Sequence, residues 1–235
     1  FFFKQKTAYE IPKRDWSSDV CSSDLWVSVL LATWSSWMWV TPTHGATLLV
    51  FGDSLSAGYG LPRDRAWPAL LAEKLKQERL DYTVANASIS GETAAGGARR
   101  MASTLARYKP SVVVLALGAN DGLRGYNLDA TRAHLEQMIT DCAKANAKVL
   151  LVSMRLPPNY GAEYTQRFRA MYTEIAKKHT VTLAPFLLEG FAGDAAWFQA
   201  DGIHPAIKAQ PRMLDNVWGS LLPLLSQAQK PIQKQ

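Results

Sequence analysis

The chain is poor in cysteine, with only Cys21 and Cys142 among its 235 residues. Cys21 lies in an N-terminal segment that we set apart below, so Cys142 has no partner within the domain and no internal disulfide can form. A domain without disulfides depends on its hydrophobic core for stability. Met138 and Ile139 precede Cys142 at helical spacing, so we expect the thiol in that core rather than at a reactive site.

Clusters of like charge and of metal ligands are also missing. The chain has 26 Lys and Arg against 20 Asp and Glu, a formal net charge of +6, without any block of five like charges. This spread of charge argues against nucleic-acid binding and leaves weak attraction to anionic lipid surfaces open. One Asp-x-x-His pair, Asp201 and His204, has no further ligands at metal spacing. From this lack of ligands we expect that the protein binds neither a metal ion nor another cofactor.

The first 46 residues differ from the rest. Residues 1–25 follow neither the period of a strand nor that of a helix and resemble a translated sequencing adapter, so we exclude them from the fold. A disordered extension is the alternative. Residues 26–46 hold an uncharged, mostly apolar stretch that is typical of a truncated signal peptide, with a membrane anchor as the lesser alternative. We expect a mature chain that begins near Ala46 and is periplasmic or secreted.

From residue 47 onward, short apolar runs alternate with longer amphipathic stretches. The predicted strands are 47–52, 82–87, 111–118, 148–153 and 181–186, and the predicted helices are 67–78, 94–108, 128–145, 162–179 and 208–225. Strands that are apolar almost throughout indicate a parallel sheet covered on both faces. We therefore predict an α/β fold, a three-layer α/β/α sandwich with right-handed connections, as one domain over 47–225. Residues 226–235 form a polar tail.

Three polar clusters follow the first three predicted strands, at the edge where such sheets bind ligands. In the first, Asp53 is explained as a helix cap, but Ser54 is not. In the second, Gly91 can bring its backbone N–H close to a ligand, although a plain loop glycine would look the same. In the third, Asn120 can aim its amide at a developing oxyanion, although Asn-Asp-Gly is also ordinary turn chemistry.

The fourth cluster, Ala-Asp-Gly-Ile-His-Pro, precedes the last predicted helix. A carboxylate three residues before a histidine, here Asp201 and His204, can bond the imidazole, set its tautomer and stabilise its cation. Gly202 and Pro205 would fix the turn. The other histidines fall in the signal-like segment or in helical patterns. Together, the four clusters offer a nucleophile, N–H donors, a base and an orienting acid in one cleft.

The stretches FGDSLSAGYG, NASISGET, LGANDGLRG and DGIHP resemble the four sequence blocks of the SGNH, or GDSL, hydrolases. The likeness extends over residues 46–225 and is greatest to the bacterial periplasmic subgroup of multifunctional thioesterase I/protease I/lysophospholipase L1 enzymes and related arylesterases. The resemblance implies a flavodoxin-like order of five parallel strands. Gly-x-Ser-x-Gly occurs nowhere in the chain, which argues against the other common serine-hydrolase fold.

The resemblance also implies site residues. Ser54 would be the nucleophile, His204 the base, and Asp201 the residue that orients His204. The backbone N–H groups of Ser54 and Gly91, with the Asn120 side chain, would form the oxyanion hole. The implied reaction is hydrolysis of carboxylic esters and thioesters, including acyl-CoA, lysophospholipid and aryl esters, through an acyl-enzyme.

Apolar and aromatic side chains in segments that flank the motifs are candidates for an acyl groove, although each could simply pack a loop. They are Leu123, Tyr126, Leu156, Pro157, Tyr160, Trp197 and Phe198. They favour medium to long acyl chains as substrates. A short-chain or carbohydrate acetyl esterase of the same superfamily is the first alternative. The second is a flavodoxin-like phosphate or flavin binder. We expect a monomer that takes a small-molecule acyl ester, with transient membrane-surface contact left open.

Overall fold

The computed structural model describes residues 45–228. The adapter-like segment, almost all of the signal-like segment and residues 229–235 of the polar tail lie outside the described residues, so the assignments made for them stay predictions. Within residues 45–228, none of the helices combines the length and the apolar character that a membrane span requires.

Five strands form one parallel sheet in the order β2-β1-β3-β4-β5. Their bounds are β1 (Ala46–Gly52), β2 (Tyr82–Asn86), β3 (Val112–Ala116), β4 (Lys148–Val152) and β5 (Thr182–Ala184). The central strand β3 is buried along its whole length, as a run of β-branched residues in a parallel sheet predicts. The chain adds β2 on one side of β1 and then β3, β4 and β5 on the other, so the strand order reverses between β1 and β3. Ligands bind at such a switch point in open parallel sheets. The predicted strand order is confirmed.

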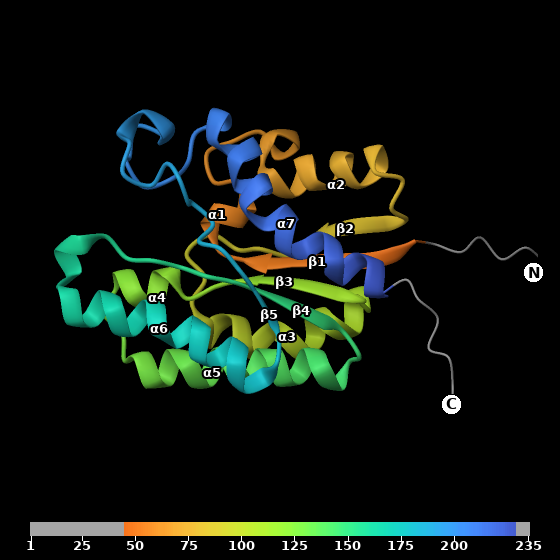
Figure 1. Cartoon of the computed structure of the whole chain (residues 1–235), viewed down its shortest axis with the longest axis horizontal. Helices are drawn as coiled ribbons and strands as arrows, with labels where there is room; N and C mark the ends of the chain where they lie inside the picture. Colours follow the sequence, from red (N-terminus) through yellow and green to blue (C-terminus); the bar gives the residue numbers. More distant parts are fainter. Residues whose placement is uncertain (1–44, 229–235) are drawn as a thin grey trace, which may run out of the picture. The chain divides into compact units, whose positions relative to one another are not determined.

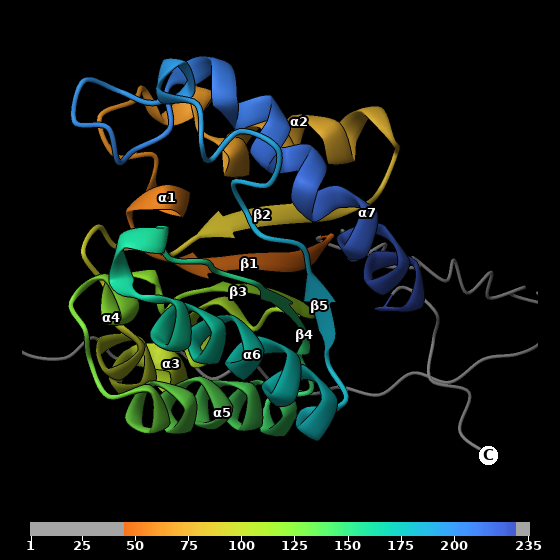
Figure 2. The ribbon, with the colours of Figure 1, turned by 60° about the vertical axis from the view of Figure 1, so that its left-hand side comes forward.

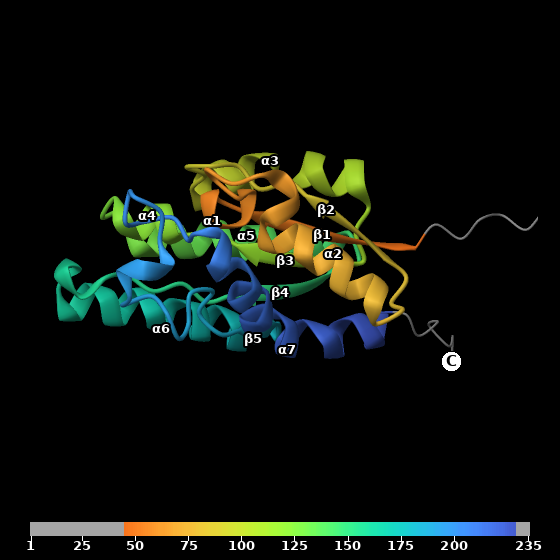
Figure 3. The same cartoon turned by 90° about the horizontal axis from the view of Figure 1, so that it is seen from above.

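Helices cover both faces of the sheet (Figure 1). On one face lie α2 (Trp67–Gln77) and α7 (Gln210–Ala228), which pack side by side (Figure 3). On the other face lie α3 (Ala94–Tyr108), α5 (Leu128–Lys144) and α6 (Ala162–His179) (Figure 2). The three-layer sandwich is therefore confirmed. Two short helices, α1 (Ser54–Ala57) and α4 (Ala119–Leu123), follow the carboxyl ends of β1 and β3 with at most two residues in between. The hydrophobic periodicity does not predict either of them.

Two predicted elements end elsewhere in the structure. β5 has three residues instead of six, because Pro185 follows Ala184 and has no backbone N–H to donate to a sheet ladder. The last helix runs to Ala228, past the predicted end at residue 225 and into the predicted tail. A short 3-10 turn, Ile207–Ala209, precedes this helix where the prediction had its first turn.

The core lies between the sheet and its two helix layers. Cys142 is fully buried there, with its Sγ 4.0 Å from the Sδ of Met101, and burial raises the pKa of the thiol to about 12. The prediction of a core cysteine is confirmed. Helix α3 approaches the sheet closely at Gly97, where a Cβ atom would lie 2.5 Å from Leu117 Cδ1 and 3.0 Å from Met138 Sδ.

This close approach predicts opposite effects for two glycine-to-alanine substitutions in helices. Gly97→Ala should lower the free energy of unfolding by about 1–2 kcal/mol, because overpacking outweighs the better helix propensity of alanine. Gly219→Ala, at an exposed site of α7 with nothing within 4 Å, should raise it by about 0.5–1 kcal/mol. Urea denaturation of both variants measures the difference. Equal stabilisation by the two substitutions would show that α3 is not tightly packed at Gly97.

Candidate active site

Ser54 lies where β1 passes into α1. Asp53 caps this helix, its Oδ1 accepting the backbone N–H of Leu55 at 3.0 Å. Ser54 is the first helical residue, so its N–H is among the first-turn donors that a helix cannot satisfy internally. Gly52 allows the tight exit from the strand, because a Cβ there would lie 2.8 Å from Ser56 Oγ and 2.9 Å from the carbonyl oxygen of Ala116. The serine hydroxyl thus stands at the carboxyl edge of the sheet.

Short contacts join Ser54 to the fourth sequence cluster. The Oγ of Ser54 lies 2.9 Å from His204 Nε2, and His204 Nδ1 lies 2.7 Å from Asp201 Oδ2. Asp201 Oδ1 also accepts the backbone N–H groups of Ile203 and His204. Hydrogen bonds from the backbone and ring of His204, together with the N–H of Ile203, lower the pKa of Asp201 to about 2. A carboxylate in this position can fix the orientation of the imidazole through its Nδ1–H.

The turn that carries His204 is held by side chains from elsewhere. Tyr59 stacks against the imidazole, with ring centroids 4.3 Å apart. Gln199 donates its backbone N–H to the carbonyl of His204 at 2.8 Å and its side-chain amide to the carbonyl of Tyr59 at 2.8 Å. Gln199 therefore ties the turn that carries His204 to the loop that follows Ser54. No sequence motif marks Gln199, since its partner is 140 residues away in the chain.

Asn120, in the first turn of α4, contacts the first and the second sequence clusters. Its Nδ2 donates to the backbone carbonyl of Glu92 at 2.9 Å and lies 3.4 Å from Asp53 Oδ2. The shorter bond fixes the direction of the amide, while the longer contact is weak. Gly91, next to Glu92, has a φ of +78°, a left-handed conformation that glycine adopts without strain.

A buried carboxylate anchors α4 itself. Asp121 is almost completely buried, and its Oδ2 accepts the backbone N–H of Ala94 at 2.8 Å, at the start of α3. Its Oδ1 lies 3.5 Å from the hydroxyl of Thr131. Burial raises the pKa of Asp121. The sequence Asn-Asp-Gly predicts an ordinary turn, so it does not predict the long-range hydrogen bond of Asp121 to α3.

A cavity of about 600 Å³ opens beside the serine. Ser54, Asn120 and His204 all line it. Of the seven candidate groove residues, Leu123, Leu156, Pro157 and Phe198 line it as well, whereas Tyr126, Tyr160 and Trp197 do not.

The three remaining aromatic residues have other roles in the structure. The Tyr160 hydroxyl donates to the carbonyl of Leu123 at 2.9 Å and so supports the loop rather than the cavity. Trp197 packs against Phe191 with ring centroids 5.3 Å apart. Tyr126 remains about half exposed to solvent. Proximity to a motif in sequence suggests these residues for the groove, but none of the three lines the cavity.

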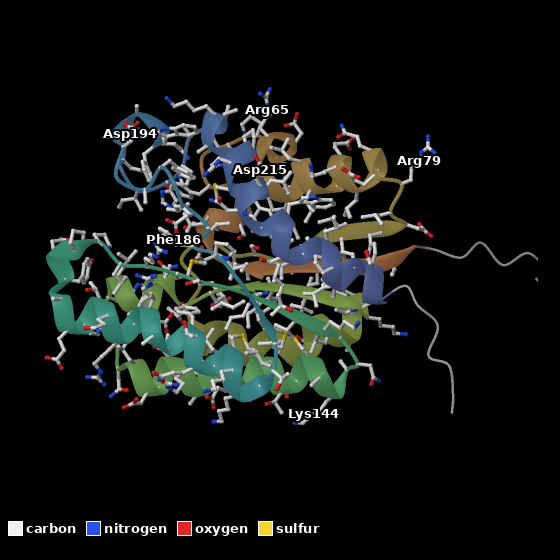
Figure 4. The ribbon with its side chains drawn as sticks, viewed as in Figure 1. Arg65, Arg79, Lys144, Phe186, Asp194 and Asp215 are labelled. Atoms are coloured by element: carbon white, nitrogen blue, oxygen red, sulfur yellow. The ribbon has the colours of Figure 1, made fainter. Side chains whose placement is uncertain are left out.

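Other cavity residues follow β4 and β5, where no motif identifies them. They include the apolar Met154, Phe186 and Leu188, and Phe186 is labelled in Figure 4 close to the carboxyl ends of the strands. Ile203, from the fourth sequence cluster, lines the cavity as well. Two charged residues also line the cavity, Arg155 after β4 and Glu189 after β5. Their side chains form a bidentate ion pair, with N–O distances of 2.7 and 3.2 Å. This pair joins two walls of an otherwise mostly apolar cavity.

Asp53 is the least ordinary group at the site, because its carboxyl is only 1% exposed and has no cation as its hydrogen-bond partner. Burial, offset only in part by the N–H of Leu55 and by His204, raises its pKa from 3.8 to about 7. The folded protein therefore holds a proton on Asp53 between about pH 4 and pH 7 that the unfolded chain has released. The stabilisation from this proton is complete at acid pH and is lost as the pH rises to about 7.

Replacing Asp53 with asparagine should remove this pH dependence. Asparagine keeps an oxygen that can accept the N–H of Leu55 but carries no charge to bury. The free energy of unfolding of Asp53→Asn minus that of the wild type should therefore increase by about 1–3 kcal/mol from pH 4 to pH 8. Urea titrations of both proteins at the two pH values give this difference. A difference that stays constant or decreases would contradict the raised pKa.

With this geometry established, known proteins provide a comparison. The family model described as the GDSL-like Lipase/Acylhydrolase family matches residues 50–209. The chain is 50% identical to esterase TesA of Pseudomonas aeruginosa over 179 residues, which cover 76% of this chain and 89% of that protein. It is 44% identical to thioesterase 1/protease 1/lysophospholipase L1 of Escherichia coli K12 over 180 residues, 77% of this chain and 85% of that one.

A solved structure gives the same result in three dimensions. The chain is similar to the psychrotrophic esterase EstA from Pseudoalteromonas, in a structure inhibited by monoethylphosphonate, with a TM-score of 0.73 and 38% sequence identity. The match covers 77% of this chain and 98% of that one. The likeness therefore spans almost all of that esterase's chain.

Proposed function

The chain belongs to the GDSL-like lipase/acylhydrolase family and is an ester hydrolase. We propose that Ser54, His204 and Asp201 form its catalytic triad. The observation that carries the proposal is the continuous set of contacts from Asp201 through His204 to the Ser54 hydroxyl, at 2.7 and 2.9 Å. Both distances are within the range that proton transfer requires.

In the first half of the reaction, Ser54 Oγ attacks the acyl carbonyl carbon and His204 Nε2 takes the hydroxyl proton. The His204 Nδ1–H stays bonded to Asp201, which stabilises the imidazolium. The Ser54 and Gly91 N–H groups and the Asn120 amide donate to the oxyanion, the amide exchanging its long contact with Asp53 for the substrate oxygen. His204 then gives its proton to the departing alcohol or thiol, which leaves the acyl-enzyme.

In the second half, water replaces the leaving group. His204 takes a proton from the water as its oxygen attacks the acyl carbon, and the same three donors hold the second oxyanion. Collapse of this intermediate breaks the bond to Ser54 Oγ, and His204 returns the proton to that oxygen. The free carboxylic acid leaves and the enzyme is restored.

Medium to long acyl chains are the proposed substrates, bound as esters or thioesters. The apolar lining of the cavity, which includes Leu156, Phe186 and Phe198, supports this choice because a sugar or an acetyl group would leave most of it unfilled. Leu123 and Ile203 line the same cavity and are themselves well exposed. These exposed apolar side chains support entry of the acyl chain from a lipid surface, with which the enzyme would make transient contact.

Two substitutions test the machinery. Ser54→Ala should abolish esterase activity and covalent labelling by a fluorophosphonate probe, because the attacking oxygen is lost. Asn120→Ala should lower kcat by about 10²–10³ and still be labelled slowly, because one oxyanion donor is removed. Circular dichroism of both variants checks that the fold is kept. Wild-type activity in Ser54→Ala would rule out this serine as the nucleophile.

Acyl-chain preference is tested with a series of p-nitrophenyl esters. Because each buried CH₂ contributes ~0.8 kcal/mol, kcat/KM should rise about tenfold for every two carbons added to acetate until the cavity is full. Phe198→Ala, which enlarges the cavity and weakens its contacts, should reduce this gain, whereas Tyr126→Ala should leave it unchanged because Tyr126 does not line the cavity. A maximum at acetate would favour the short-chain alternative instead.

A further inference from the structure

Arg100 of α3 binds the loop between β2 and α3 through two hydrogen bonds and also contacts an aromatic ring of β1. Its Nε donates to Glu92 Oε2 at 2.6 Å, and its Nη1 donates to the backbone carbonyl of Ala87 at 2.8 Å. The guanidinium also lies over the ring of Phe51, 3.8 Å from its centroid. The side chains of Arg100 and Glu92 are only 21% and 12% exposed, so solvent screens this ion pair less than a surface pair.

The loop that Arg100 holds, residues 87–93, contains one donor of the proposed oxyanion hole and the acceptor that orients another. Gly91 supplies one backbone N–H, and the Glu92 carbonyl oxygen accepts the Asn120 amide at 2.9 Å. Glu92 is therefore bound at both ends, by Arg100 through its carboxylate and by Asn120 through its backbone. A shift of this residue would move the acceptor that orients Asn120.

Other hydrogen bonds also hold the loop: the Glu92 N–H donates to the carbonyl of Ile89 at 3.1 Å, and Arg124 Nη2 donates to the carbonyl of Gly91 at 3.3 Å. Ala87 and Ile89 donate their N–H groups to the carbonyls of Val50 and Gly52, which continue the sheet ladder along one side. Beyond Ile89, Gly91 has a left-handed conformation. The carboxylate of Glu92, where Arg100 binds, lies in this part of the loop.

We propose that Arg100 is a positioning residue of the oxyanion hole, which fixes the Glu92 carbonyl and through it the Asn120 amide. The inference rests on the proposed role of Asn120. An arginine suits the task because its planar fork donates to the Glu92 carboxylate and the Ala87 carbonyl together. A lysine has one charged nitrogen and cannot reproduce both directions. Since an oxyanion exists only in the transition state and the intermediates, Arg100 affects the rate and not substrate binding.

The test is a kinetic double-mutant cycle with a medium-chain p-nitrophenyl ester. Arg100→Gln should lower kcat at least tenfold with little change in KM. In the Asn120→Ala background the same substitution should cost less than threefold, because the amide that Arg100 orients is already gone. All rates are measured well below the Tm of each variant, so that loss of folded protein does not enter.

Three further variants separate positioning from a general effect on the fold. Arg100→Lys keeps the charge but not the fork, and should lose part of kcat. Glu92→Gln keeps an oxygen that can accept from Arg100 and also keeps its backbone carbonyl, so it should retain more activity than Arg100→Gln. Arg107→Gln is the matched control, since Arg107 lies on the same helix over the Tyr108 ring and should keep the wild-type kcat.

The outcomes distinguish this inference from the proposed function. If Arg100→Gln lowers kcat by the same factor in both backgrounds, or lowers only the Tm, Arg100 does not act through Asn120 and the inference is overturned. If Asn120→Ala itself keeps the wild-type kcat, the oxyanion assignment fails, and the role of Arg100 fails with it. A large loss for Arg100→Gln that nearly disappears beside Asn120→Ala supports both.

Discussion

The site depends on a sheet whose strands all run in one direction. Because both faces of this sheet are covered by helices, its strands are apolar, and polar chemistry is confined to the loops at their ends. The parallel arrangement brings the loops after β1, β2 and β3 to the same edge. Ser54 and His204 are 150 residues apart in sequence and yet lie within hydrogen-bond distance there. Each loop needs to supply only one or two groups.

Much of this arrangement could be predicted from the sequence. Buried strands and amphipathic helices leave periodic patterns, so the layers and most helix bounds follow from local residues. The contacts of Gln199, Asp121 and Arg100 could not be predicted, because they join elements far apart in the chain or bond to backbone carbonyls, which carry no residue signature. Side-chain direction in loops is also unmarked, so Trp197 was assigned to the groove and instead packs against Phe191.

Asp53 illustrates how the site conflicts with stability. Its two carboxyl oxygens have separate partners, the N–H of Leu55 and the amide of Asn120. A carboxylate offers a hydrogen-bond acceptor to both donors. An asparagine at this position would place its own NH₂ group against the NH₂ group of Asn120. The nearly complete burial of this acid disfavours its charged form. Such local conflicts are expected at functional sites and are compensated by the rest of the core.

The long sequence separation within the proposed triad also affects when the enzyme becomes active. Gln210, at the start of α7, accepts the backbone N–H of Trp67 at the start of α2, so the segment bearing the base is fastened to the first third of the domain. A nascent chain that has not yet released its final helix holds Ser54 without His204 fixed beside it. Ester cleavage therefore reports that both ends of the domain have come together, which makes turnover a convenient readout of complete folding.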